Sequence, residues 1–322
     1  MKITFSNVDQ LKSLNYFLST NDLSDSSRLE IMTTSNWMNI HPVCLSFAAA
    51  LAVEVGQDNT SIETDVPRAA MYLDRMGLYR FSRSECPVEY TQHEEAGRFI
   101  PVTQIRTDRE QSDFIADLHP ILHLTPEKSE TIKYVLGELI RNVIEHSMSP
   151  NGAFVTVQYV AAKDKLSIGI CDTGIGLRAS LERYHMPVDD MDAIRLALMP
   201  GVSGTTARDG GTGDNAGAGL YIVKSITKIT RNYFVIYSGD SAYKMHKYDK
   251  RVKFGPRLND NPFVDKHTTY DGLPSFGGTL VGLDITLTDT KQFSEILEKI
   301  KISYSQAIRN RKKRKYKEVR FE

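Results

Sequence analysis

The chain contains little cysteine, with Cys44, Cys86 and Cys171 scattered over 322 residues. Their odd number and wide spacing exclude a framework of disulfide bonds, and no two of them have the paired spacing of a metal site. Such cysteine usage is typical of a reducing compartment. We therefore expect a cytoplasmic protein.

A net charge of one sign and a long apolar segment are also absent. Lysine and arginine number 40, as do aspartate and glutamate, so no overall field attracts nucleic acid or a membrane surface. The longest apolar run, around residues 48–53, is far shorter than the ~20 residues that span a bilayer. The first residues, MKITFSNVDQLKS, lack the basic stretch and apolar core of a signal peptide. We expect no membrane partner.

The composition that remains is that of a folded globular chain, with 41% hydrophobic and 25% charged residues. The length suits two ordinary domains. Short strands and helices alternate over residues 1–83, whereas residues 84–112 carry Pro87, Pro101 and many charges, which is typical of a connection. We expect a smaller α/β domain at residues 1–100, a larger α/β domain at 101–290, and a C-terminal helix with a basic tail at 291–322.

The strongest helical periodicity lies in residues 127–147, which include the sequence ELIRNVIEH at 138–146. Its apolar stripe consists of Ile132, Val135, Leu136, Leu139, Ile140, Val143 and Ile144. Glu138 and Asn142 are four residues apart on another face, about 40° apart around the axis. A carboxylate and a carboxamide so placed suit a water molecule and a hard metal ion, because both offer oxygen ligands. A solvated helix face is the alternative interpretation.

Three glycine-containing motifs follow along the chain. CDTGIG at residues 171–176 comes directly after an apolar strand, so its glycines allow a flat ligand close to the backbone, or form only a tight turn. GGTGDNAGAGLYIVK at 210–224 leads into a helix, whose free amides and positive dipole end suit phosphate oxygens; a flexible loop is the alternative. FGGTLVGLDI at 276–285 enters a strand. None of them is a Walker A loop or a complete Rossmann fingerprint.

Together, in this order, the four motifs resemble the N, G1, G2 and G3 boxes of the GHKL superfamily. That superfamily comprises gyrase-type topoisomerases, heat-shock chaperone ATPases, histidine kinases and MutL-type repair proteins. The resemblance covers residues 125–290. It implies a Bergerat-type two-layer α/β sandwich, with a mixed sheet and helices on one face, that binds ATP and Mg²⁺.

The resemblance also implies roles for individual residues. Asn142 would hold Mg²⁺, Asp172 would accept a hydrogen bond from the adenine amino group, and Thr279 would support the adenine site. The glycines beside Asp172 would let the base pass, and those of the segment 201–219 would form a lid over the phosphates. The implied nucleotide-binding set is Asn142, His146, Asp172, Gly174, Gly176, Gly211, Gly213, Gly217, Gly219, Leu220 and Thr279.

Glu138 narrows the resemblance within the superfamily. Sensor histidine kinases usually lack a carboxylate four residues before the metal-binding asparagine, whereas other branches have it as a general base. The Glu-x3-Asn-x3-His pattern of Glu138, Asn142 and His146 is closest to that of the anti-sigma-factor serine kinases. His146 would then contact phosphate, or be a helix-surface histidine without function.

The N-terminal part resembles a STAS domain, through its Ala-rich helix after Pro42 and the sequence AAMYLDRMGLYRF at 69–81. In the position of the phosphoacceptor serine of that family stand Asn39, Ile40, His41 and Pro42, so we expect a regulatory domain that accepts no phosphate. A generic α/β cap is the alternative.

We expect a bacterial-type signalling protein: a nucleotide-gated switch with slow ATP hydrolysis that acts on a protein partner. A kinase acting on a separate serine or histidine acceptor and a non-hydrolysing nucleotide sensor are the alternatives. His93 lacks the sequence context of a histidine-kinase acceptor. His119 and His123 are candidates for an acceptor, and we favour a structural role for both. The tail RNRKKRKYK at 309–317 has seven basic residues, and we interpret it as a solvated helix end or a disordered tail rather than a site for nucleic acid or an acidic partner. A homodimer remains open.

Overall fold

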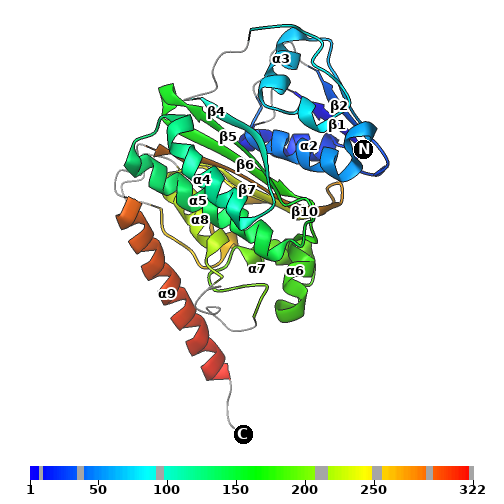
Figure 1. The fold of residues 1–322 in the computed structure, drawn as a ribbon. Coiled ribbons are helices and arrows are strands. Elements are labelled where there is room, and N and C mark those ends of the chain that lie inside the picture. The colour runs from blue at the N-terminus through cyan, green and yellow to red at the C-terminus, as the bar shows by residue number, and fades with distance from the viewer. Residues whose placement is uncertain are drawn as a thin grey trace.

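A computed structural model describes residues 1–6, 10–34, 40–91, 98–206, 217–248, 256–287 and 293–318, without the side chains of 119–121 and 314–318. The described chain forms a three-stranded sheet near the N-terminus and a seven-stranded sheet in the larger part (Figure 1). Mixed α/β architecture is therefore confirmed, with the larger sheet layered against helices.

Parallel strands build the N-terminal sheet, in the order β1-β2-β3. Parallel neighbours require crossover connections, and helices supply them here. The elements are β1 (Lys2–Phe5), α1 (Leu14–Thr20), β2 (Leu29–Thr33), α2 (Pro42–Val55), β3 (Thr60–Glu63) and α3 (Pro67–Arg75). The predicted Ala-rich helix after Pro42 and the alternation of short strands and helices over residues 1–83 are confirmed.

Antiparallel strands build the larger sheet, in the order β4-β5-β6-β10-β7-β8-β9. The strands are β4 (Phe99–Ile105), β5 (Ala153–Val160), β6 (Lys165–Asp172), β7 (Phe234–Gly239), β8 (Ser241–Met245), β9 (His267–Tyr270) and β10 (Phe276–Thr286). Every pairing among these strands is antiparallel. The mixed strand directions that we expected within this sheet are therefore wrong in detail, and parallel pairs occur only in the N-terminal sheet among the described strands.

The helices that follow β4 along the chain cover one face of the larger sheet (Figure 1). They are α4 (Asp108–Leu122), α5 (Pro126–His146), α6 (Gly176–His185), α7 (Asp190–Ala197), α8 (Gly219–Ile229) and α9 (Phe293–Glu318). The predicted helix at 127–147 and the helix expected at the end of the glycine-rich motif at 210–224 are confirmed. The second half of α9 projects beyond the sheet and its helices (Figure 1).

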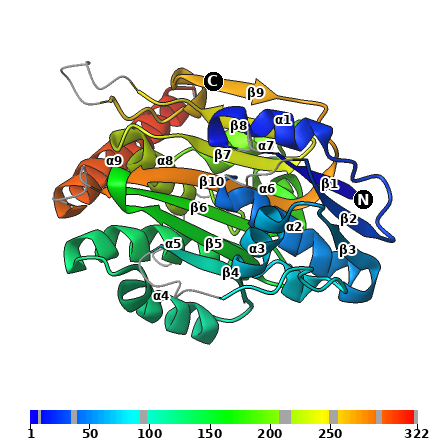
Figure 2. The ribbon, with the colours of Figure 1, turned by 90° about the horizontal axis from the view of Figure 1, so that it is seen from above.

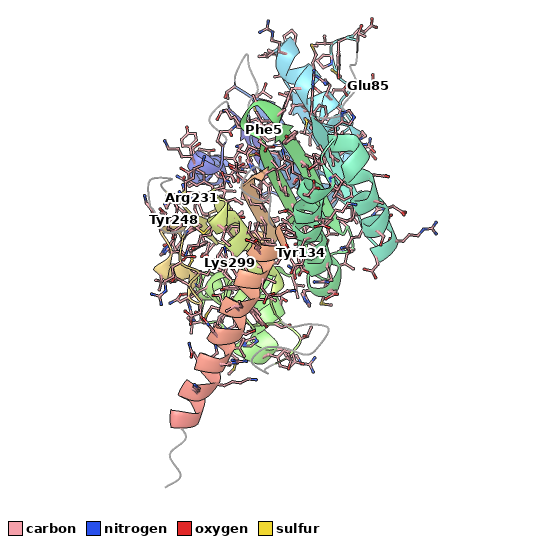
Figure 3. All side chains as sticks on the ribbon, turned by 90° about the vertical axis from the view of Figure 1, so that its left-hand side faces the viewer. Phe5, Glu85, Tyr134, Arg231, Tyr248 and Lys299 are labelled. Atoms are coloured by element: carbon pink, nitrogen blue, oxygen red, sulfur yellow. The ribbon has the colours of Figure 1, made fainter. Side chains whose placement is uncertain are left out.

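The N-terminal elements cover the opposite face of the same sheet (Figure 2). Because side chains alternate along a strand, neighbouring residues of β5 enter different cores. Phe154 packs with the N-terminal helices and Val155 packs with α5. Both faces are buried, which explains why the strands of this sheet are almost continuously apolar.

Two adjacent glycines allow α2 to lie directly on the sheet. Gly169 of β6 pairs with Gly282 of β10. A Cβ atom on Gly169 would lie 2.3 Å from the backbone of Val43, and one on Gly282 would lie 3.0 Å from a side-chain methyl carbon of Val43. Only glycine leaves room for this contact. Ser46 of α2 completes it, with its hydroxyl 3.0 Å from the carbonyl oxygen of Gly169.

A buried polar cluster joins the same helix to the sheet. His41 caps α2 by accepting a hydrogen bond at Nδ1 from the amide of Val43, and its Nε2 faces the Asp284 carboxylate at 3.4 Å. Ser167 donates to Asp284 at 2.6 Å, and the Lys165 ammonium lies 3.1 Å from it. Burial lowers the pKa of His41, while His41, Lys165 and Ser167 outweigh burial and hold the pKa of Asp284 below its ordinary value.

The connection that we predicted at residues 84–112 differs from the structure. Its second half contains β4, the edge strand of the larger sheet, and the start of α4. The expected boundary at residue 100 thus falls within a strand. Pro101 is tolerated because the strand pairs on one side only and its register shifts at this point.

The helices of the described residues include none that is both long enough and apolar enough to cross a membrane.

Candidate functional site

Helix α5 has an apolar face and a polar face, and the polar face lines a cavity. The predicted apolar stripe packs into the core beneath the larger sheet. Glu138, Asn142 and His146 line a cavity of about 200 Å³ together with the end of β6, the start of α6, residues 202–204 and the start of α8. These side chains are only partly exposed, so the face borders a cavity rather than open solvent, and its role in binding stays a prediction.

Asp172 lies at the end of β6 and lines the same cavity. Its side chain is almost fully buried, with 2% exposed. Burial raises the pKa of Asp172 to about 7, although backbone hydrogen bonds from Gly174 and Thr279 oppose the rise. The Gly174 amide donates to the Asp172 carboxylate at 2.8 Å. A buried carboxylate without a cationic partner costs folding energy, which is typical of a ligand-binding group.

Thr279 stands beside Asp172 because β10 pairs with β6 at these two residues. It also lines the cavity. The register of two strands that are distant in sequence thus brings the predicted adenine-binding pair together. The sequence carried no information about this register.

The glycines after Asp172 make room for neighbouring backbone. A Cβ atom on Gly174 would lie 2.0 Å from the Ser147 carbonyl oxygen, and one on Gly176 would lie 2.7 Å from that of Gly277. Gly176 also has a positive φ of +73°. These glycines therefore allow the loop between β6 and α6 to pack closely against the end of α5 and against β10. Their role in admitting a base stays a prediction.

Helix α8 begins against the polar face of α5. A Cβ atom on Gly219 would lie 2.8 Å from Oε2 of Glu138 and 3.2 Å from Nδ2 of Asn142. Gly217 has a φ of +64°, and its carbonyl oxygen accepts a hydrogen bond from the Gly201 amide at 2.9 Å. Gly217, Gly219 and Leu220 all line the cavity. Gly211 and Gly213 lie outside the described residues.

The carboxylate of Glu138 is paired with an arginine that sequence reasoning missed. Arg141 forms an ion pair with Glu138 one helical turn earlier, and it lines the cavity. The i,i+3 spacing of opposite charges in ELIRNVIEH was the available signal. Our sequence interpretation treated Glu138 as an unpaired base.

Asn142 and His146 differ in how well they suit a metal and a phosphate. Nδ2 of Asn142 is buried without a hydrogen-bond partner among the described residues, so its carboxamide has capacity for a further ligand. Burial lowers the pKa of His146, which leaves the imidazole neutral at pH 7 and able to donate a hydrogen bond rather than a charge.

No group of three or more acidic, histidine or cysteine side chains within the described ranges forms a metal site. A Mg²⁺ ion held through Asn142 would accordingly take its other oxygens from phosphate and water, as this ion commonly does. The unpartnered Nδ2 of Asn142 is a hydrogen-bond donor and suits a phosphate oxygen, whereas Mg²⁺ would bind the carbonyl oxygen Oδ1. The predicted metal role of Asn142 stays a prediction.

Comparison with known proteins supports the superfamily suggested by the motifs. No curated protein matches the chain. Residues 127–245 match the family described as histidine kinase-, DNA gyrase B-, and HSP90-like ATPase. The matched segment extends from α5 to β8 and includes Glu138, Asn142 and Asp172. This part of the chain is thus similar to the GHKL ATPases, and the match supports ATP binding by a kinase-like ATPase domain.

Proposed function

We propose that this protein is a nucleotide-gated regulatory switch that binds ATP with Mg²⁺ and hydrolyses it slowly. The observation that carries the proposal is the buried Asp172 carboxylate in a cavity that Glu138 and Asn142 also line. An acceptor for a base and polar groups for phosphate chemistry thus share one cavity.

Asp172 serves as the adenine-recognising group. As a carboxylate, Asp172 accepts a hydrogen bond from the exocyclic amino group of adenine. Its burial strengthens this hydrogen bond because water does not compete for the carboxylate oxygens. Its Gly174 contact fixes the carboxylate in place. The family similarity of residues 127–245 supports the same role.

The N-terminus of α8 serves the phosphates. This helix begins at Gly219 beside Glu138, and its N-cap residue Ala218 offers no side-chain hydrogen bond to the first amides. Unpaired amides and the positive end of the helix dipole attract phosphate oxygens. The helix therefore supplies a phosphate-facing wall.

Glu138 serves as the group that orients or deprotonates water for attack on the terminal phosphate. Mg²⁺, when bound through Asn142 and the phosphates, supplies charge neutralisation. Glu138 transfers only the proton of the water. Val202 and Gly217 line the cavity, so a bound nucleotide contacts both of them.

The N-terminal elements serve as the regulatory part, in contact with the sheet face opposite the cavity. Since Phe154 and Cys171 of the sheet share their core, a shift of β5 or β6 on nucleotide binding reaches them directly. We propose that these elements are STAS-like and engage the protein partner of a bacterial signalling pathway.

Incubating the full-length protein with γ-labelled ATP and Mg²⁺ tests the proposal. We expect nucleotide binding and slow release of labelled free phosphate. Label on a partner protein would favour a serine or histidine kinase, which the Glu-x3-Asn-x3-His pattern supports. Nucleotide binding without release of phosphate would favour a non-hydrolysing sensor. The Glu138–Arg141 pair supports this alternative, because it engages the carboxylate that would otherwise activate water. Absence of nucleotide binding would overturn all three.

A further inference from the structure

Arg141 stands out among the residues of the cavity by its charge. Among the described residues that line it, Arg141 is the only lysine or arginine, whereas three carboxyl groups line it: Glu138, Glu145 and Asp172. A triphosphate entering this cavity meets more negative than positive groups. Its terminal phosphate therefore needs a cation from the protein in addition to Mg²⁺.

The guanidinium of Arg141 is already engaged by carboxylates on its own helix. It pairs with Glu138 at i−3 and lies 4.0 Å from a carboxylate oxygen of Glu145 at i+4. Glu138 raises the pKa of Arg141 against the opposing effect of burial, so the group stays charged. Its side chain is 45% exposed, whereas that of Glu138 is only 13% exposed. The arginine therefore has room to move and the glutamate has little.

The ion pair has a chemical consequence for Glu138. The Glu138 oxygen that accepts a hydrogen bond from Arg141 has fewer lone pairs left to accept one from a water molecule. Phosphate and carboxylate both match the fork of N–H donors on a guanidinium. A phosphate placed beside this pair therefore competes with Glu138 for the same donors.

We propose that Arg141 exchanges partners, from Glu138 in the nucleotide-free protein to the terminal phosphate of bound ATP. The exchange makes Arg141 the residue that distinguishes ATP from ADP, and it frees the Glu138 carboxylate only when a terminal phosphate is present. Arg141 itself transfers no proton. The inference rests on the proposed ATP binding and adds to it the residue that distinguishes bound ATP from bound ADP.

Affinities for ATP and ADP, measured by calorimetry with Mg²⁺ on the full-length protein, test this inference. Arg141→Gln should weaken ATP binding about 10- to 100-fold, the range of one to two lost charge-assisted hydrogen bonds. ADP affinity should stay within about threefold, since ADP lacks the group that Arg141 contacts. Arg141→Lys should restore part of the ATP preference, because it keeps the charge but not the fork.

Two comparisons separate this role from a structural one. Lys133→Gln removes a charge from the same helix outside the cavity and should leave both affinities unchanged. Glu138→Gln releases Arg141 and should raise ATP affinity severalfold when Arg141 is present. In the double variant with Arg141→Gln, the same substitution should leave ATP affinity unchanged. A purely structural contact would not produce this coupling.

Equal loss of ATP and ADP affinity in Arg141→Gln, or no loss of either, would overturn the inference while leaving the proposed function in place. Failure of the parent protein to bind either nucleotide would overturn both. Circular dichroism of each variant at the assay temperature shows whether the helix is retained.

Discussion

Asp172 illustrates a conflict between stability and function at a single residue. The pKa of this carboxyl group is about 7 in the folded protein and 3.8 for an ordinary aspartate. Between these pH values the folded state holds a proton that the unfolded state has released. Stability attributable to Asp172 therefore falls as the pH rises from about 4 to 7 and levels off above.

Asp172→Asn should separate binding from stability. The carboxamide keeps the acceptor for the Gly174 amide but presents a donor to the adenine amino group, so we expect ATP affinity to fall by about 1.5–3 kcal/mol. At pH 8 the variant should be more stable than the parent by about 2–4 kcal/mol, and near pH 4 this gain should vanish. Urea unfolding at both pH values and calorimetry with ATP measure the two effects. Unchanged ATP affinity would remove Asp172 from the site.

Glu138 and Asn142 lie one turn apart on α5 yet suit different tasks. Glu138→Ala should leave ATP affinity unchanged or raise it severalfold by releasing Arg141, but it should reduce phosphate release by ~10²–10⁴, the usual range for a lost general base. Asn142→Ala should weaken Mg²⁺-dependent binding and turnover together. Glu130→Ala, an exposed carboxylate on the same helix outside the cavity, is the matched control. Full ATPase activity of Glu138→Ala would exclude the catalytic role.

At the scale of elements, two glycines differ in the space that a Cβ atom would have. Gly169 lies in β6 against the backbone of α2, whereas Gly137 lies within α5 and has room for a Cβ atom. The nearest atom to a Cβ on Gly137 would be Nε2 of Gln111 at 3.9 Å, an ordinary contact. The same substitution should therefore have opposite effects at the two positions.

Gly169→Ala should lower the free energy of unfolding by about 1–3 kcal/mol, because the added carbon meets the Val43 backbone, which cannot rotate away. Gly137→Ala should raise it by about 0.5–1 kcal/mol through better helix propensity. Thermal or urea unfolding of both variants measures the difference. A Gly169→Ala protein as stable as the parent would show that α2 moves freely on the sheet.

At the scale of the whole molecule, the N-terminal elements and the sheet share one apolar core. That core joins Phe47 of α2 to Tyr237 of β7 and Phe276 of β10, whose rings lie 5.1–6.2 Å apart. We therefore expect the full chain to unfold in a single calorimetric transition. Two well-separated transitions would show that the N-terminal elements fold independently of the sheet.

The buried His41 should make the stability of the whole molecule depend on pH. Burial lowers the pKa of His41 from the ordinary 6.5. Just below that pH, His41 is therefore protonated in the unfolded state but still neutral in the folded state. Stability is thus lost as the pH falls below about 6.5. His41→Asn keeps a side-chain cap for α2 but cannot titrate, and its unfolding free energy should change less between pH 7 and pH 5.5. Identical pH dependence in the two proteins would contradict this account.

The polar and apolar faces of α5 could be predicted from the sequence. A helix repeats every 3.6 residues, so residues three and four positions apart in the sequence share a face. The same holds for α8, which begins after a glycine-rich segment. The strand β4 was missed because Pro101 and the charges nearby outweighed its short apolar pattern. Only pairing with β5 makes this segment a strand.

By itself, the sequence determined the helix faces, the order of the four motifs and the identity of Glu138, Asn142 and Asp172 as candidates, since each depends on residues close together in the chain. The tertiary structure alone decided the rest. Strand register placed Thr279 beside Asp172, and helix packing placed Gly219 against Glu138. Whether Glu138 has Arg141 as its partner depends on side-chain rotamers and burial, which spacing permits but does not fix. Contacts between distant segments and the desolvation they cause arise only when the chain is folded.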